Sequence, residues 1–293
     1  MGKARSADEY PLGEGKLKWT CTEWLEDNLD GDFVLLDCQP NIHDYIKEHI
    51  PGAVYFNPAL LRVPKNGIPG NYIPEDAVEA LFERVGIDED YPTIVYTGTG
   101  PFKGWGDGLE QTMLAYSLLR FGAEEVWLLD GGIDTWKHEG RELSQIFPEC
   151  DGSSFDVDVQ DDFYLKYEEF KEVKDGDDVI LLDARPVNVY EGQGPWRKPG
   201  HIPGAVSLPW KTFFHEENTR LLKSDDEIAG ILDEHGITKD HHVICSCGTG
   251  REATAEFTIF KWLLDFPHVK IYEGSFTEWC HYDEPTVTGP NPR

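Results

Sequence analysis

Residues 179–183, Val-Ile-Leu-Leu-Asp, repeat residues 33–37, Phe-Val-Leu-Leu-Asp, and this pair shows how the 293-residue chain is organised. Three further pairs follow in the same order in both halves: His-Ile-Pro-Gly-Ala at 49–53 and 201–205, Thr-Gly-Thr-Gly at 97–100 against Cys-Gly-Thr-Gly at 247–250, and Leu-Asp-Gly-Gly at 129–132 against Tyr-Glu-Gly-Ser at 272–275. The last pair is followed by a tryptophan in each half, Trp136 and Trp279. A spacing of about 150 residues is far too long for a solenoid repeat, so the chain contains a duplicated domain.

Within each half, short β-branched runs alternate with amphipathic stretches. In the second half, the patterns predict strands at 178–183, 205–208, 242–246 and 269–272, and helices at 224–235 and 252–264. Strand runs such as Val243-Ile244 are apolar on both faces, which is typical of a mainly parallel sheet covered by helices on both faces. We therefore expect an α/β fold with two tandem domains, at residues 15–145 and 160–286, joined by a linker around 140–160.

The composition limits the possible partners. Asp and Glu number 55 against 26 Lys and Arg, which gives a net charge of −29. Such a field repels nucleic acid and anionic membranes, so we expect neither as a partner. The chain has no apolar run of the roughly 18 residues that a membrane span needs, and no secretory signal at its N-terminus. Its six cysteines lack disulfide-framework spacing, so we expect reduced thiols and a cytoplasmic location. A small anionic substrate would need local positive groups.

The segment 245–253, Cys-Ser-Cys-Gly-Thr-Gly-Arg-Glu-Ala, runs from a predicted strand into a predicted helix. Gly248 and Gly250 let the backbone curl so that successive N–H groups point inward, and the start of the helix adds the positive end of its dipole. A thiol at Cys247 in such a bowl is expected to have a lowered pKa, because the amides stabilise the thiolate. Arg251 adds a positive charge at the rim. This interpretation requires that the Cys247 side chain faces the amides and has a route to solvent.

Two short signatures resemble those of the rhodanese family of sulfurtransferases. The first is an aromatic residue, three residues and then His-Ile-Pro-Gly-Ala, at 45–53, closed by Phe56. The second lies at 269–279 and contains Tyr-Glu-Gly-Ser-Phe and Trp279. The active loop of the family begins with a cysteine and is similar to residues 247–252. The resemblance covers roughly residues 30 to 285 and implies two tandem rhodanese-like domains.

The resemblance implies a ping-pong sulfurtransferase that needs no metal and no organic cofactor. Cys247 attacks the outer sulfur of a small anionic donor, thiosulfate or 3-mercaptopyruvate, and the resulting persulfide passes its sulfur to cyanide, a thiol or a carrier protein. Thr97 stands where Cys247 stands, so the N-terminal domain is expected to be catalytically silent, and its glycine-rich segment 100–106 to be structural. His49 and His201 are expected to shape turns, as in the family, rather than to act in catalysis.

The implied substrate-binding residues are Gly248, Thr249, Gly250, Arg251, Glu252 and Arg197. Arg251 is the best candidate to hold the charged group of the donor by bidentate hydrogen bonds, which favours the dianion thiosulfate. The glycine after the cysteine is instead typical of family members that use 3-mercaptopyruvate. A second substrate-binding arginine of the family is replaced by Val189. We interpret Arg185 as structural, and Arg197 and Lys198 as candidates to compensate for the missing arginine.

Two alternatives stay open. Counted from Cys245, the loop fits the Cys-x5-Arg pattern of cysteine phosphatases, with Arg251 as the arginine. Against a phosphatase, the repeat makes Cys247 the first residue of the loop, and Ile244 stands where such phosphatases generally have histidine. The second alternative is a carrier that takes sulfur on Cys247 once and delivers it to a dedicated protein. A relay between the two cysteines is also physically possible, because residues i and i+2 of a strand point to the same side.

Overall fold

The computed structural model describes residues 5–88, 90–100, 108–150 and 152–292. The chain divides into two compact units. Unit 1 consists of Met1–Leu61, Ile73–Gln160 and Phe214–Lys223, and unit 2 consists of Arg62–Tyr72, Asp161–Phe213 and Ser224–Arg293. All but the first residue of the glycine-rich segment 100–106 lie outside the described residues.

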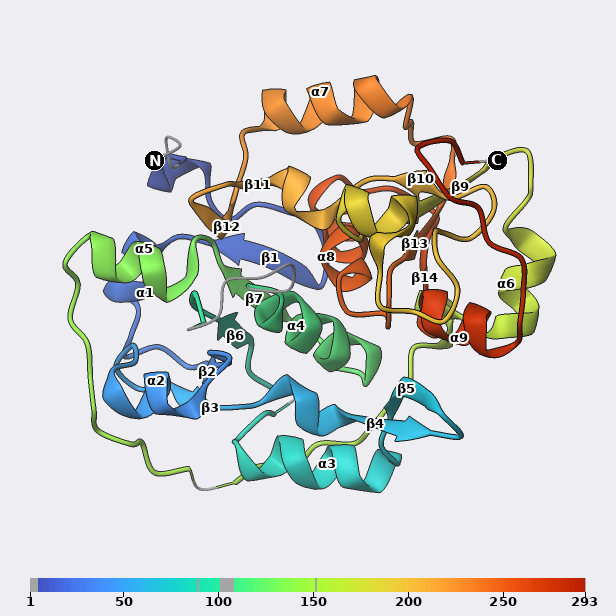
Figure 1. The fold of residues 1–293 in the computed structure, drawn as a ribbon. Coiled ribbons are helices and arrows are strands. Elements are labelled where there is room, and N and C mark those ends of the chain that lie inside the picture. The colour runs from blue at the N-terminus through green and yellow to red at the C-terminus, as the bar shows by residue number, and fades with distance from the viewer. Residues whose placement is uncertain (1–4, 89, 101–107, 151, 293) are drawn as a thin grey trace. The chain divides into compact units, whose positions relative to one another are not determined.

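Unit 1 is built on a five-stranded sheet in which all neighbouring strands are parallel (Figure 1). The strand order is β1 (Leu17–Thr20), β7 (Val126–Leu129), β6 (Thr93–Tyr96), β2 (Val34–Asp37) and β3 (Val54–Tyr55). The helices are α1 (Thr22–Asp27), α2 (Ile42–Lys47), α3 (Glu75–Arg84), α4 (Glu110–Arg120) and α5 (Gly132–His138), with short 3-10 turns at η1 (Ala7–Glu9) and η2 (Pro58–Leu61). Helices α1 and α5 share a hydrophobic core with the sheet, and α4 contacts β6 and β7.

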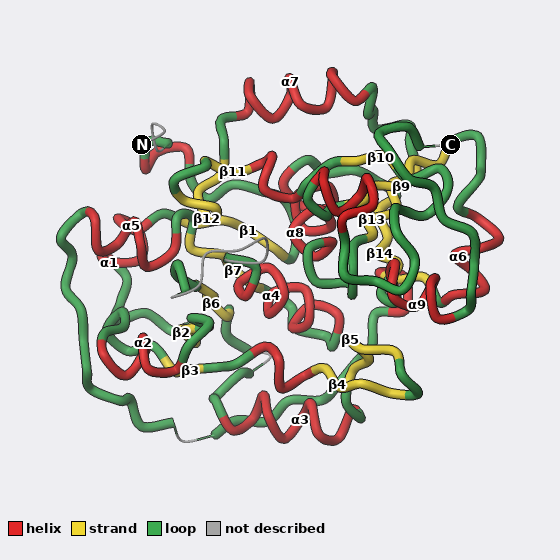
Figure 2. The backbone as a smooth tube through the Cα atoms, in the orientation of Figure 1, coloured by secondary structure: helices red, strands yellow, loops and turns green. Residues whose placement is uncertain are grey.

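Unit 2 repeats this architecture (Figure 2). Its parallel five-stranded sheet has the order β10 (Val206–Ser207), β9 (Val179–Asp183), β13 (His242–Ser246), β14 (Val269–Tyr272) and β8 (Tyr164–Leu165). The helices are α6 (Tyr167–Val173), α7 (Asp225–His235), α8 (Ala253–Thr258) and α9 (Ser275–His281), with shorter turns at η3 (Asp161–Phe163), η4 (Val189–Gln193), η5 (Trp210–Phe213) and η6 (Ile259–Leu263). The predicted class, two α/β domains with parallel sheets flanked by helices, is confirmed.

Local sequence explains where the elements begin and end. At the start of α7, Ser224 Oγ accepts a hydrogen bond from the Glu227 N–H at 3.4 Å, and the Ser224 N–H donates to the Glu227 carboxylate at 3.0 Å. This reciprocal pair satisfies donors that the first turn leaves unpaired. Gly236 ends the helix with φ of +63°, a conformation that favours glycine.

Strand β13, which leads to the cysteine loop, is buried on both faces. Ile244 packs with residues of α6 and α9 in the core of unit 2. Because successive side chains of a strand alternate between faces, Val243 and Cys245 point to the opposite side, where α8 contacts β13 and β14. Burial on both faces accounts for the continuous apolar run that the sequence shows there.

Each unit contains one antiparallel hairpin that comes from the opposite half of the sequence. Strands β4 (Arg62–Lys65) and β5 (Ile68–Tyr72) follow β3 of unit 1 but are part of unit 2, where β5 contacts α9. Strands β11 (Phe214–His215) and β12 (Asn218–Leu222) follow β10 of unit 2 but are part of unit 1, where β12 contacts α5. The domain limits expected from the sequence, 15–145 and 160–286, place β4–β5 in the N-terminal domain and β11–β12 in the C-terminal domain. The internal repeat gives no sign that each hairpin belongs to the other unit.

The core of unit 2 can be tested on helix α6. Phe170 is fully buried and stacks on Tyr272 with ring centroids 4.0 Å apart. Phe170→Ala is expected to lower the free energy of unfolding by about 3–5 kcal/mol, measured by urea denaturation, because it leaves a cavity. Val173→Ala on the same helix is the control: its residue is 40% exposed, and we expect a change within about 0.5 kcal/mol. Equal losses in both variants would contradict this packing.

Candidate active site

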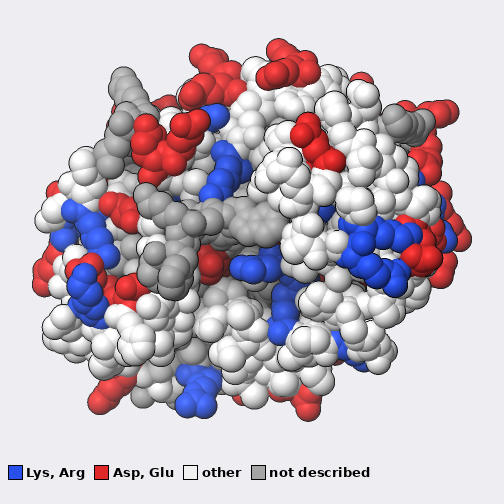
Figure 3. Space-filling view, in the orientation of Figure 1, with Lys and Arg blue, Asp and Glu red and all other residues white. Residues whose placement is uncertain are grey.

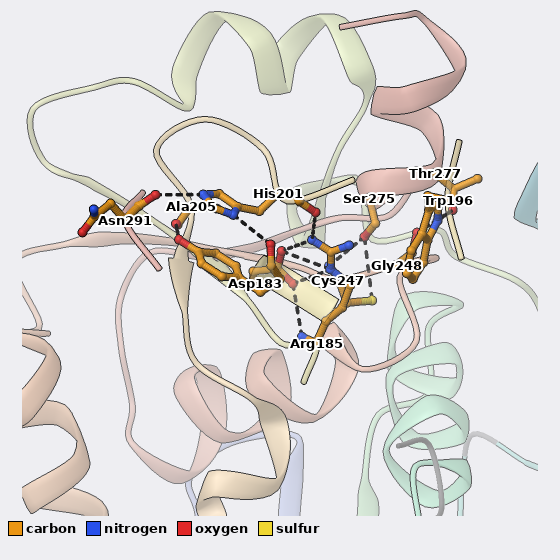
Figure 4. A network of polar contacts seen from close by, with 12 residues as sticks. Asp183, Arg185, Trp196, His201, Ala205, Cys247, Gly248, Ser275, Thr277 and Asn291 are labelled. Carbon is orange, nitrogen blue, oxygen red and sulfur yellow. Dashed lines mark hydrogen bonds and ion pairs between the residues drawn. The ribbon is translucent and has the colours of Figure 1, made fainter. Parts of the chain in front are cut away.

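Cys247 is the first residue of the loop that joins β13 to α8 (Figure 4). The strand ends at Ser246, so the cysteine lies directly at the carboxyl end of a central parallel strand. The backbone N–H groups of Thr249 and Ala253 lie close enough to the sulfur to lower the pKa of its thiol, and the Ser275 hydroxyl lies 3.9 Å from Sγ. The side chain therefore faces the amides of its own loop, which is the first of the two requirements set out above.

The first turn of α9 fixes the backbone of this loop (Figure 4). The Cys247 N–H donates to Ser275 Oγ at 3.1 Å, and the Cys247 carbonyl accepts the Phe276 N–H at 3.0 Å. The Gly248 carbonyl accepts both the N–H and the hydroxyl of Thr277, at 3.0 and 2.7 Å. Ser275 itself has φ of +50°, a conformation that a non-glycine residue adopts at some cost. The first turn of α9, which lies within the second signature at 269–279, is thus part of the site.

Trp196 lies over the backbone of Gly248. A Cβ atom at Gly248 would come within 2.4 Å of Trp196 Cζ2, so a side chain at this position would displace the indole ring. The ring is held by a hydrogen bond of 2.7 Å from Nε1 to Thr277 Oγ1, the same hydroxyl that binds the Gly248 carbonyl. The absence of a side chain next to Cys247 therefore allows the tryptophan to cover the loop.

Asp183 and Arg185 form a buried ion pair beside the loop. Arg185 Nη2 lies 2.5 Å from Asp183 Oδ2, and Nε lies 2.8 Å from Oδ1. Nη2 also donates to the Gly200 carbonyl at 3.0 Å, and the Arg185 side chain has no exposed surface. These contacts agree with the interpretation of Arg185 as a structural residue. Val189, at the position of the missing family arginine, is buried as well.

The second requirement, a route to solvent, is not met in the structure, because Cys247 is fully buried. The loop sequence predicts instead a thiol in a bowl of amides with a route to solvent. A donor therefore reaches Sγ only after a covering group moves. Trp196 is the large side chain that lies over the adjacent residue, so it is the first candidate for that movement.

The pKa of Cys247 is raised above its ordinary value, which is the opposite of the expected direction. Burial is the largest cause, and the negative charge of the nearby Glu252 carboxylate adds to it. The N–H groups of Thr249 and Ala253 act in the expected direction but are outweighed. The loop sequence alone does not reveal how deeply the sulfur is buried. Glu256, one turn further along α8, is also fully buried, and burial raises its pKa well above the ordinary range.

The structure separates the predicted substrate-binding residues into two groups. Those that share the loop with Cys247 are Gly248, Thr249, Gly250, Arg251 and Glu252, and the side chain of Arg251 is exposed. Arg197 is instead held by the end of α9: Nη2 donates to Asp283 Oδ1 at 2.9 Å and to the Cys280 carbonyl at 3.2 Å. Lys198 also pairs with Asp283. Figure 3 shows lysine and arginine side chains in separate groups among the acidic ones on the face drawn.

Cys245 lies inside strand β13, paired with Leu182 of β9 and Ile271 of β14. It is fully buried, and burial followed by the charge of Glu256 raises its pKa well above the ordinary value. A phosphatase nucleophile would have to be the first residue of the anion-binding loop. The position of Cys245 within the sheet therefore argues against the Cys-x5-Arg alternative.

His49 and His201 each hold a turn in their own unit. Both are fully buried, and both ring nitrogens of each lie within hydrogen-bond distance of backbone carbonyls. His201 stacks on Tyr190 with ring centroids 3.6 Å apart, and His49 stacks on Tyr45 at 4.2 Å. With both nitrogens engaged, neither ring is placed to accept a proton from a substrate. This geometry agrees with the expected structural role.

Thr97, at the position equivalent to Cys247, is fully buried in unit 1. Its hydroxyl donates to the Cys38 carbonyl at 3.0 Å, and its N–H donates to Gln111 Oε1 at 3.3 Å. The Thr97 hydroxyl is therefore already hydrogen-bonded to the backbone of the residue that follows strand β2.

Three residues near the cysteine loop were not nominated from the sequence: Trp196, Glu256 and Arg62. Glu256 stands four residues after Glu252 on a predicted helix, a spacing that places both on one face and could have drawn attention to it. Trp196 precedes the nominated Arg197 but carries no recognisable motif. Arg62 belongs to the first half of the sequence and gave no signal, yet its guanidinium lies against Gly250.

A parallel α/β sheet with a cysteine loop at the end of a central strand fits a sulfurtransferase-type domain, and the comparison with known families agrees. The family described as Rhodanese-like domain matches residues 22–139 and 166–282, once in each half. The chain belongs to the rhodanese family and is a sulfurtransferase.

Curated relatives span nearly the whole chain. A putative thiosulfate sulfurtransferase of Synechococcus elongatus is 30% identical over 287 residues, which cover 95% of this chain and 87% of the relative. The sulfur carrier protein TtuD of Thermus thermophilus is 29% identical, and the 3-mercaptopyruvate sulfurtransferase of Escherichia coli K12 is 26% identical; each match covers 88% of this chain and 92% of the relative.

Solved structures share the fold. Wild-type EanB superposes with a TM-score of 0.81 at 22% identity, covering 91% of this chain and 68% of that chain. YnjE superposes with a TM-score of 0.79 at 22% identity, covering 94% and 69%. Among the helices of the described residues, none has the length and apolar character to cross a membrane.

The role of Glu252 in the high pKa of Cys247 predicts the outcome of removing its charge. In Glu252→Gln, the pKa of the thiol falls, so alkylation of Cys247 by iodoacetamide near neutral pH should become about tenfold faster, equivalent to about 1.4 kcal/mol. Peptide mass mapping would follow the rate across pH. Glu256→Gln is the matched control with a smaller expected effect, because that carboxyl is not among the groups that raise the pKa of the Cys247 thiol. Slower alkylation in Glu252→Gln would refute this electrostatic assignment.

The close contact between Gly248 and Trp196 predicts that a methyl group is not tolerated there. Gly248→Ala should lower the free energy of unfolding by about 1–3 kcal/mol through overpacking, measured by chemical denaturation. Gly230→Ala, in α7, has no atom within 4 Å of the added Cβ and should be neutral or stabilising by up to about 1 kcal/mol. A neutral Gly248→Ala would show that the indole does not rest on the loop.

Proposed function

We propose that the protein transfers a sulfane sulfur from thiosulfate, or from 3-mercaptopyruvate, to a thiophilic acceptor through a persulfide on Cys247. The observation that carries this proposal is the position of Cys247 Sγ against the Thr249 and Ala253 amides at the end of a central strand. These donors can hydrogen-bond to a negatively charged sulfur, either the thiolate or the deprotonated persulfide.

The reaction takes place in two steps. Once the group that covers the loop has moved, the Cys247 thiol loses its proton to solvent, and the thiolate attacks the outer sulfur of thiosulfate. The sulfur–sulfur bond of the donor breaks and sulfite leaves with the electron pair. With 3-mercaptopyruvate, the carbon–sulfur bond breaks and the departing enolate takes up a proton to give pyruvate. The nucleophilic acceptor, which is cyanide, a thiol or a carrier protein, then takes the terminal sulfur and the Cys247 thiolate is restored.

The N-terminal half is proposed to be silent in this reaction. Thr97 offers a hydroxyl that is already bonded to the Cys38 carbonyl, and a hydroxyl cannot store a sulfane sulfur as a persulfide. The six cysteines are all free, which supports a reducing, cytoplasmic location for a chain that depends on a thiol.

A second function, delivery of sulfur to a dedicated protein without turnover on small acceptors, is supported by the similarity to the Thermus thermophilus sulfur carrier protein. The two functions share the Cys247 persulfide and differ in the acceptor. Cyanide or a small thiol would discharge the enzyme repeatedly, whereas a dedicated carrier would keep its sulfur in their presence.

Intact-mass measurement after incubation with each donor tests the proposal. The wild-type protein should gain the mass of one sulfur atom, and Cys247→Ser should gain none. Cys245→Ser is the matched control, since it removes a thiol two residues away that is equally buried, and it should still gain sulfur. Loss of sulfur uptake in Cys245→Ser but not in Cys247→Ser, or hydrolysis of an aryl phosphate that depends on Cys245, would overturn the proposal.

A further inference from the structure

We infer that Arg62, on the hairpin β4–β5 from the first half of the sequence, binds the anionic group of the sulfur donor at the Cys247 loop. The inference rests on the proposed function, since it names the group that binds the donor of that reaction. It also answers a physical difficulty: a chain with a net charge of −29 needs local positive charge to attract a small anion.

The hairpin brings Arg62 into close contact with the loop. Arg62 Nε donates to the Gly70 carbonyl at 2.8 Å, and the guanidinium lies 5.3 Å from the centre of the Tyr72 ring. A Cβ atom at Gly250 would come within 3.0 Å of Arg62 Nη2, and one at Gly70 within 2.9 Å of the Thr249 carbonyl. Two glycines that face each other thus let the hairpin approach the backbone of the loop, and the guanidinium lies at that contact.

The terminal nitrogens of Arg62 are available to a ligand. Within the residues that the structure describes, neither Nη atom makes a hydrogen bond or an ion pair, and the side chain is only half-buried. Two other arginines near the loop are paired with carboxylates, Arg185 with Asp183 and Arg197 with Asp283, although Arg185 Nη1 is buried without a hydrogen-bond partner. Of these three arginines within the described part of the chain, Arg62 is the one whose guanidinium is not paired with a carboxylate.

In unit 1, the arginine of the equivalent hairpin is paired with a carboxylate. There the exchanged hairpin supplies Arg220, whose Nη2 donates to Thr99 Oγ1 at 2.8 Å and lies 3.2 Å from Asp134 Oδ2. Asp134 and Thr277 stand at equivalent positions, each two residues before the tryptophan of its repeat. The half with Thr97 thus provides a carboxylate for its arginine, whereas the half with Cys247 has a hydroxyl at that place. This difference leaves the charge of Arg62 for a ligand.

The chemistry of the group defines the ligand. A guanidinium presents parallel N–H donors that match two oxygens of one anion, so it suits the sulfonate end of thiosulfate or the carboxylate of 3-mercaptopyruvate. Arg62 is a substrate-binding residue in this account. It acts together with the exposed Arg251, the residue that follows Gly250.

The test measures the rate of persulfide formation on Cys247 against thiosulfate concentration in the full-length protein. Arg62→Gln should raise the half-saturating thiosulfate concentration about 10- to 100-fold, since charge-assisted hydrogen bonds are lost, and Arg62→Lys should recover part of it. Lys65→Gln is the matched control, because it removes the same charge from an exposed position on the same strand, and it should behave as the wild type. Reaction of Cys247 with uncharged S-methyl methanethiosulfonate should be unchanged in all variants.

Each outcome separates the inference from the function on which it rests. If the wild type takes no sulfur from either donor, the proposed function fails. If the wild type takes sulfur and Arg62→Gln has the thiosulfate dependence of Lys65→Gln, the inference is overturned and the function stands. A loss of both thiosulfate and methanethiosulfonate reactivity in Arg62→Gln also counts against it, because Arg62 would then support the loop rather than the donor.

Discussion

The hydrogen bonds between residues 247–248 and the first turn of α9 are the constraint on which the site depends. A glycine-containing loop has many backbone conformations, and only a few of them direct N–H groups toward one sulfur. The Cys247 and Gly248 carbonyls and the Cys247 N–H are all engaged by residues 275–277, which selects one of these conformations before any substrate binds. The second signature of the family therefore has a physical task although it lies almost thirty residues from the cysteine.

The fixed position of Cys247 in this loop also affects the pKa of its thiol. Anchoring the loop removes the sulfur from water, and the cost of desolvating a thiolate exceeds what two backbone amides return while Glu252 stands beside it. The resting thiol is therefore largely protonated. Such a thiol is protected from non-specific alkylation and oxidation, because the rates of both reactions increase with thiolate character and exposure. In the proposed reaction, an anionic donor would add more negative charge beside the loop, which a positive group there would offset.

The sequence predicted those features that depend on local pattern. The strands 242–246 and 269–272 coincide with β13 and β14, because continuous apolar runs bounded by polar residues have few alternatives. The family and the position of Cys247 at the strand end followed from motifs that keep fixed spacings. The direction of the thiol pKa could not be predicted, since burial is a property of the packed protein. Neither could Arg62 nor Trp196, because nothing in the chain marks which distant segment reaches Gly250 or Gly248.

Duplication gives one chain two versions of the same loop, one with threonine and one with cysteine at its first position. Each unit receives a hairpin from the opposite half of the sequence, and each hairpin brings an arginine to the loop. In unit 1 the arginine, Arg220, lies 3.2 Å from Asp134 Oδ2, and the Thr97 hydroxyl donates to the Cys38 carbonyl, so both groups have a partner within the protein. In unit 2, cysteine stands at 247 and threonine at 277, so the loop carries a thiol, and Arg62 has no carboxylate partner among the described residues. A site that has to bind an anion and react with it needs both changes together, since a thiol without the charge attracts no donor and a charge without the thiol performs no transfer.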